Sequence, residues 1–224
     1  VHGGLRIIKR QPHAEKPMRR VYLYGIYERI WHWTMAASII ALLITGIQIH
    51  FPGSGSGQRF NILVLVHNVA AVIMILNAAL SLFFHITTGE IRQFVPRPKG
   101  FVRRITAQAM YYLRGIFTGA AHPLAKSAKH KLNPLQQVTY VGLLNVLFPL
   151  QVLTGALLWI GGVAPQVLEP IGGLSIIGPV HNVGSWLFLT FIVVHVYLTT
   201  TGHTPGALIK AMVSGWEMLE EEAE

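Results

Sequence analysis

The sequence predicts an all-α integral membrane protein, a four-helix bundle with interfacial amphipathic helices on the cytoplasmic side. Three observations support this fold class. The 224 residues are 52% hydrophobic and only 12% charged, which is about half the charged fraction of a typical soluble domain. The mean hydropathy is +0.47, and four segments are apolar over enough length to cross roughly 30 Å of hydrocarbon. The Lys and Arg residues are also distributed unevenly, as in membrane proteins that keep their cations on the cytoplasmic side.

The predicted spans cover residues 30–50, 62–86, 135–160 and 178–200. Pro149 lies inside the third span and is expected to bend it, because proline removes a backbone hydrogen bond. Residues 87–134 form a cytoplasmic loop between the second and third spans. We expect residues 1–224 to form a single membrane domain.

The cations predict the orientation. Sixteen of the 18 Lys and Arg residues lie before the first span or in the loop 87–134, and Lys210 follows the fourth span. Only Arg59 lies between the first two spans. The positive-inside rule then places both termini in the cytoplasm. It also explains the net charge of +9, so no nucleic-acid partner is predicted.

Two further segments, residues 101–117 and 206–219, mix cations with aromatic and aliphatic residues at helical spacing. Each is too polar to span a membrane and is typical of a helix lying on its surface, among the lipid head groups. An ordinary solvated helix remains the alternative for both.

Cofactor chemistry in this chain has to depend on histidine. The absence of cysteine excludes disulfides, iron–sulfur clusters and thiolate metal sites within the chain. Among the eleven histidines, four fall at two depths of the predicted bundle. His67 and His181 lie toward the outer side, and His32 and His195 lie toward the cytoplasmic side.

The fourth span relates the two depths. His181 and His195 are 14 residues apart, which is about 21 Å along a helix and only about 40° short of four full turns. Both therefore lie on one helical face, as two stacked haem groups would require. Haem b is apolar around most of its rim, and its iron accepts neutral imidazole on each side.

Several readings stay open for individual residues. A histidine inside a span is often a hydrogen-bonded core residue or a proton relay. His85, at the inner end of the second span, could be a proton carrier, a surface histidine or an extra ligand. Arg29, one turn before His32, is expected either to meet haem propionates or to act as a cytoplasmic anchor. Small residues would let a flat ring approach a helix closely; the candidates are Gly46, Gly155 and Gly184.

Three motifs resemble the di-haem cytochrome b membrane subunits of formate dehydrogenase, thiosulfate reductase and nickel–iron hydrogenase. They are "RIWHWTMAASIIALLITG" in the first span, "LVHNVAAVIMILNAALSLFFH" in the second, and the two histidines of the fourth. The similarity extends over nearly all of the chain. The cytoplasmic loop is most similar to the thiosulfate reductase branch.

The resemblance implies two haem b groups, one held by His32 and His195 and the other by His67 and His181. It also implies a site for menaquinone or another quinone at "KLNPLQ", with Lys131, Asn133 and Gln136 as candidates. Pro134 and Leu135 depart from the pattern of some relatives. An asparagine before proline is also a common helix start, so Asn133 has an alternative role as a helix cap.

The predicted function is that of a membrane-anchoring electron-transfer subunit in a bacterial or archaeal cytoplasmic membrane, in contact with lipid. Its expected partner is a redox subunit that carries iron–sulfur clusters, c-type haems or a molybdenum cofactor. Apart from quinone redox chemistry, the chain is expected to perform no substrate chemistry of its own. The alternatives are a proton-coupled transporter and a haem-free membrane anchor. A transporter would predict acidic residues within the spans, and the spans contain none in their interiors.

Overall fold

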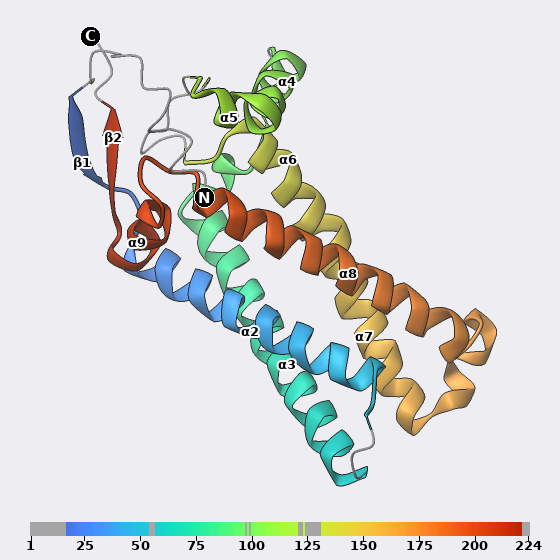
Figure 1. Ribbon diagram of the computed structural model, residues 1–224. Helices are drawn as coiled ribbons and strands as arrows, with labels where there is room; N and C mark the ends of the chain where they lie inside the picture. The colour runs from blue at the N-terminus through green and yellow to red at the C-terminus, as the bar shows by residue number, and fades with distance from the viewer. Residues whose placement is uncertain are drawn as a thin grey trace. The chain divides into compact units, whose positions relative to one another are not determined.

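The computed structural model describes residues 17–53, 57–96, 98, 100–120, 123 and 131–220 (Figure 1). Part of the predicted cytoplasmic loop, residues 97, 99, 121–122 and 124–130, lies outside the described residues. Four helical segments in the described chain are long and apolar enough to cross a membrane, which confirms the predicted all-α membrane fold.

The four spans agree with the sequence prediction to within a few residues at each end. They are α2 (Ile26–His50), α3 (Gly57–Thr87), the segment Pro134–Val163, and α8 (Leu174–Thr199). The helices α2 and α3 each extend beyond the apolar stretch at their first residues, because a helix continues through polar residues such as Glu28 and Arg59 while its backbone hydrogen bonds can be made.

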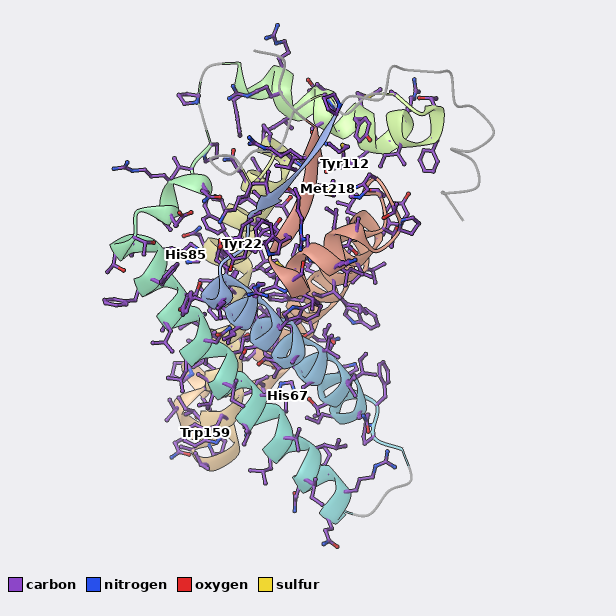
Figure 2. The ribbon with its side chains drawn as sticks, turned by 90° about the vertical axis from the view of Figure 1, so that its left-hand side faces the viewer. Tyr22, His67, His85, Tyr112, Trp159 and Met218 are labelled. Carbon is purple, nitrogen blue, oxygen red and sulfur yellow. The ribbon has the colours of Figure 1, made fainter. Side chains whose placement is uncertain are left out.

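Large apolar side chains cover the outside of these helices. Leu65 is 62% exposed, Phe83 is 67% exposed and Trp159, labelled in Figure 2, is 64% exposed. Contiguous apolar surface of this extent is unfavourable in water and favourable in lipid. The exposed residues therefore agree with a membrane environment for the spans.

The third span contains the irregularity that Pro149 predicts. It consists of α6 (Pro134–Gly142), a π-helical turn η3 (Leu143–Leu147) and α7 (Phe148–Val163). Proline has no backbone N–H and its ring crowds the carbonyl of residue i−4, here Asn145. The wider π-turn, which ends directly before Phe148, accommodates this break in the hydrogen-bond ladder.

The shorter elements lie mostly in the segments between and after the spans. They are β1 (Met18–Tyr22), η1 (Glu90–Gln93), α4 (Phe101–Met110), η2 (Tyr111–Gly115), α5 (Ile116–Thr118), η4 (Pro165–Val167), η5 (Glu169–Ile171), α9 (Ala207–Ser214) and β2 (Trp216–Glu220). The first predicted surface helix is confirmed as helical through α4, η2 and α5. The second is helical only as far as Ser214, and the residues that follow form a strand.

That strand pairs with β1 in an antiparallel two-stranded sheet, which the sequence did not predict. Gly215 separates α9 from β2 and has a φ of 87°, in the left-handed region. A Cβ atom at Gly215 would lie 2.6 Å from Cε2 of Tyr22 and 2.7 Å from the carbonyl oxygen of Tyr24. Glycine is therefore required here, both by the backbone conformation and by the close approach of the chain.

The chain divides into two compact units. The first takes the described residues of Val1–Arg29, Gly89–Val141 and Val194–Glu224, and the second takes those of Ile30–Thr88 and Gly142–Val193. In the second unit, Ile39, Met74 and Phe188 form the buried centre of an apolar cluster. The expectation of one membrane domain over the whole chain stays a prediction.

Candidate functional site

His67 lies on α3 and is held by α2. Figure 2 labels His67 on α3. Its Nδ1 atom is 2.8 Å from the hydroxyl oxygen of Thr45, which is itself buried. The Thr45 hydroxyl also donates to the carbonyl of Ala41 at 2.7 Å, one turn earlier in α2. The threonine therefore links the imidazole to the backbone of the neighbouring helix.

His181 is held in the same manner by a second pair of helices. It lies on α8, and its Nδ1 atom is 2.9 Å from the hydroxyl oxygen of Thr154 on α7. Thr154 is also buried, and its hydroxyl donates to the carbonyl of Leu150 at 2.7 Å. The two histidines thus have closely similar environments on different helix pairs.

The rings of His67 and His181 lie close together. Their centres are 6.4 Å apart and their planes form an angle of 66°. A metal bound by an imidazole nitrogen lies about 2 Å from that nitrogen, hence roughly 3 Å from the ring centre. Two imidazoles that hold one metal between them would have centres roughly 6 Å apart, so the spacing of this pair suits a shared iron.

Glycines lie against both imidazoles. A Cβ atom at Gly46 would be 3.4 Å from Cε1 of His67, and one at Gly155 would be 3.3 Å from Cε1 of His181. Two of the three glycines that the sequence singled out therefore border the histidine pair. The third, Gly184, instead faces the side chain of Gln151, whose oxygen would be 2.6 Å from a Cβ at that position.

The donor set of the site suits haem, which takes one or two ligands from the protein. Within the described residues there is no group of three or more His, Cys, Asp or Glu side chains that could hold a metal. Protein sites for zinc and similar ions supply three or four ligands. Haem needs only one or two from the protein, because the porphyrin supplies the other four. Two neutral imidazoles are the donor set that it requires.

The other predicted ligands lie on the same helices. His32 is on α2, with its ring edge-on to Trp33 at 5.2 Å between centres. His195 is on α8, which is continuous from Leu174 to Thr199, so the 14-residue spacing to His181 is a helical one. His32 belongs to the second unit and His195 to the first. Their pairing around an inner haem stays a prediction.

Arg29 combines features of both of its expected roles. One terminal nitrogen, Nη1, donates to the carbonyl of Val213 at 2.6 Å, at the end of α9, where a cation also interacts favourably with the helix dipole. Its Nε–H is buried and has no hydrogen-bond partner among the described residues. A buried N–H without a partner is unfavourable, so this donor is suited to an acceptor such as a propionate.

Asn133 and Gln136 cap the start of α6. The backbone N–H of Gln136 donates to the side-chain oxygen of Asn133 at 2.9 Å, and the backbone N–H of Asn133 donates to that of Gln136 at 3.0 Å. This reciprocal pair is a capping box. The Asn133 amide also donates to the hydroxyl of Tyr112 at 2.9 Å. The capping role that the sequence left open is therefore present.

Lys131 takes part in an ion pair close by. Its ammonium group is 2.6 Å from a carboxylate oxygen of Glu28, and both side chains are largely buried. It also lies 5.9 Å from the ring centre of Tyr24, within the range of a cation–π interaction. His85 is buried on α3, where its Nδ1 is 2.7 Å from the carbonyl oxygen of Ser81.

The sequence analysis did not select Thr45 and Thr154, although a signal for them exists. The tetrapeptide "VHNV" occurs twice, at residues 66–69 and 180–183, and each copy contains one of the paired histidines. The dipeptide Thr-Gly occurs five times in the chain, and the copies at residues 45–46 and 154–155 contain the two threonines. The two motifs together form a short internal repeat whose copies meet in the structure at the two imidazoles.

Comparison with known proteins agrees with this geometry. The profile of the prokaryotic cytochrome b561 family matches residues 23–215. The chain belongs to this family. A protein of Escherichia coli (strain K12) named "Putative cytochrome YdhU" is 34% identical over 218 residues, covering 96% of this chain and 82% of that protein.

More distant relatives carry the names of subunits of redox complexes. A "Probable Ni/Fe-hydrogenase B-type cytochrome subunit" of Rhizobium leguminosarum bv. viciae is 27% identical, over 93% of this chain and 94% of its own length. A "Putative protein-methionine-sulfoxide reductase subunit YedZ1" of Azospira oryzae (strain ATCC BAA-33 / DSM 13638 / PS) is 26% identical, over 86% of this chain and 98% of its own length.

The family and the four apolar helices make this chain an integral membrane cytochrome b that binds haem b and transfers electrons. The resemblance found in the sequence is thereby confirmed. A proton-coupled transporter and a haem-free anchor are both disfavoured, since neither accounts for membership of a cytochrome family.

Proposed function

We propose that the chain is the di-haem b subunit of a membrane redox complex and passes electrons between a partner subunit and the quinone pool. The observation that carries this proposal is the His67–His181 pair, with ring centres 6.4 Å apart and each Nδ1 hydrogen-bonded to a threonine. Haem with two imidazole ligands supplies one-electron transfer and has no open position for oxygen chemistry. These two histidines would hold the iron of an outer haem.

His32 and His195 are the ligands of a second, inner haem. The continuous helix α8 supports this assignment, because it places His195 on the same face as His181 and about 21 Å further along the axis. The buried Nε–H of Arg29, three residues before His32, is available to hold a propionate at that end of α2.

The partner is a redox subunit that delivers or accepts electrons at the outer haem. Two of the relatives are named as subunits, one of a hydrogenase and one of a reductase. This chain has no cysteine for an iron–sulfur cluster of its own. The substrate chemistry is therefore assigned to a partner with iron–sulfur clusters, c-type haems or a molybdenum cofactor. The distribution of Lys and Arg supports a bacterial or archaeal inner membrane location with both termini in the cytoplasm.

The quinone site is assigned to the start of α6. An amide nitrogen carries two hydrogens, and the bond to Tyr112 uses one of those on Asn133. The second can donate to a quinone carbonyl. Gln136 holds Asn133 in place through the capping box, and Lys131 provides an ammonium group near the same helix start.

The visible spectrum of the purified chain tests the proposal directly. We expect the detergent-solubilised protein to retain two low-spin b-type haems per chain, measured as the ratio of haem to protein. One haem per chain would contradict the inner site, and a colourless protein would contradict the proposal as a whole.

We expect Asn133→Ser to impair quinone reduction while leaving haem content unchanged. Serine caps helices about as well as asparagine, so α6 keeps its start, but the amide donor is lost. Losing a hydrogen bond to a bound carbonyl costs about 1 kcal/mol, or roughly fivefold in turnover at low quinone concentration. The measurement is reduction of a soluble quinone analogue by the chemically reduced cytochrome. Unchanged quinone kinetics would leave Asn133 with its capping role alone.

A further inference from the structure

We propose that Thr45 and Thr154 are positioning residues which, each with the glycine that follows it, set the tautomer and the orientation of the two imidazoles of the outer site. This inference rests on the proposed function, because it concerns haem ligation by His67 and His181. It adds two hydroxyl groups to the site and assigns them an effect on the reduction potential.

The first step is to account for the hydroxyl hydrogens. A threonine hydroxyl has one hydrogen to donate and lone pairs to accept with. In Thr45 that hydrogen is directed to the carbonyl of Ala41 at 2.7 Å, with Leu42 at 3.3 Å. In Thr154 it is directed to Leu150 at 2.7 Å, with Gln151 at 3.3 Å. Neither hydroxyl has a second hydrogen for the histidine, so each can only accept at its contact with Nδ1.

The histidine protons follow from this. Because each hydroxyl oxygen accepts, Nδ1 of His67 and of His181 must carry the hydrogen in these contacts of 2.8 and 2.9 Å. A neutral imidazole protonated at Nδ1 has its lone pair on Nε2. That is the tautomer which can bind iron through Nε2. The two threonines thus select the ligating form of both imidazoles.

The glycines complete the arrangement. A Cβ atom at either Gly46 or Gly155 would lie 3.9 Å from the Nδ1 of the adjacent histidine and closer still to its Cε1. The backbone of α2 or α7 therefore approaches one edge of each ring. With a hydroxyl on Nδ1 and a helix backbone beside Cε1, rotation of each imidazole is restricted from two directions.

Threonines that bond to their own helix are frequent in this chain, so the back-bond alone is not informative. Thr190 on α8 donates to the carbonyl of Trp186 at 2.9 Å but is exposed. Thr45 and Thr154 differ from it in being 6% and 5% exposed and in contacting histidine on another helix. Thr190 is therefore a suitable matched control.

The expected effect is on the reduction potential. An acceptor at Nδ1–H makes the imidazole a stronger donor to the metal, which stabilises ferric over ferrous iron. Valine has the shape of threonine and no acceptor. We expect Thr45→Val and Thr154→Val each to lower the preference of one haem for ferric over ferrous iron about tenfold. A tenfold change raises the midpoint potential of that haem by about 59 mV for one electron. The potential of the other haem should not change.

The test is a potentiometric titration of the purified full chain, followed in the visible spectrum. The expected result is a raised potential for one haem in each valine variant, with the wild-type value in Thr45→Ser, Thr154→Ser and Thr190→Val. Loss of one haem from a valine variant, restored by serine, would support the same conclusion. Potentials unchanged in both valine variants, or a loss that serine does not restore, would overturn the inference. A wild-type protein without haem would instead refute the proposed function.

Discussion

Replacing His181 with alanine is expected to remove the outer haem and leave the inner one in place. The variant loses one of two axial nitrogens, and Thr154 loses the imidazole that its hydroxyl contacts at 2.9 Å. The remaining ligand, His67, would hold the iron with one protein bond in a site arranged for two, and we expect the haem to be lost during purification. We expect the haem-to-protein ratio to fall by half and electron flow from partner to quinone to fall at least 100-fold, because losing only a hydrogen-bond partner of a metal ligand already costs about 10–100-fold.

The control for this experiment is another histidine in the same chain. His203 is exposed and lies after α8, so His203→Ala should retain both haems. Retention of one haem in His181→Ala also shows that the bundle still folds. If His181→Ala kept the haem content and the spectrum of the wild-type protein, the pairing of His181 with His67 would be wrong.

The spans were predictable because lipid imposes a simple requirement on sequence. A segment such as 62–86 has to be apolar throughout its length, and α3 occupies Gly57–Thr87. The ends were less predictable, because helix ends depend on caps and on neighbouring polar residues rather than on hydropathy. Pro149 identified the irregular part of the third span, although the type of irregularity, a π-turn, depends on local backbone adjustment.

The small sheet could not be predicted in the same way. Its strands are only five residues each, and Tyr22 pairs with Trp216 across almost the whole chain. The apolar side chains of Trp216, Met218 and Leu219 fit a helical spacing as well as an alternating one. The left-handed glycine at 215, which ends α9, decides between the two.

The histidines of the site could be predicted from the sequence, but the side chains that contact them could not. The depths of His67 and His181 follow from counting residues within spans, and the structure brings their rings together. The threonine contacts depend on which faces of α2 and α3, or of α7 and α8, meet. Helix faces are set by side-chain packing between helices, which a single sequence does not specify. The repeated "VHNV" is the one sequence signal that two helix pairs hold their histidines in the same way.

Adding a branched side chain at Gly155 is expected to displace the outer haem as effectively as removing a ligand. The Cβ position alone would be 3.3 Å from Cε1 of His181, closer than nearly all ordinary contacts. Valine adds two methyl groups beyond that point, so the imidazole has to rotate away from Thr154. Overpacking of this kind costs about 1–3 kcal/mol, and here the strain is relieved by moving the ligand itself.

Gly162 provides the matched control on the same helix. A Cβ there would meet nothing within 4 Å, so Gly162→Val has the same helix-propensity change as Gly155→Val without the collision. We expect Gly155→Val to retain about half of the wild-type haem and Gly162→Val to retain all of it, measured per purified chain. Equal haem content in the two variants would mean that the backbone of α7 does not constrain the ring of His181. Comparable loss in Gly46→Val, on α2, with no further loss in the double variant, would show that both helix pairs act on the same haem, because each glycine touches only one of its two ligands.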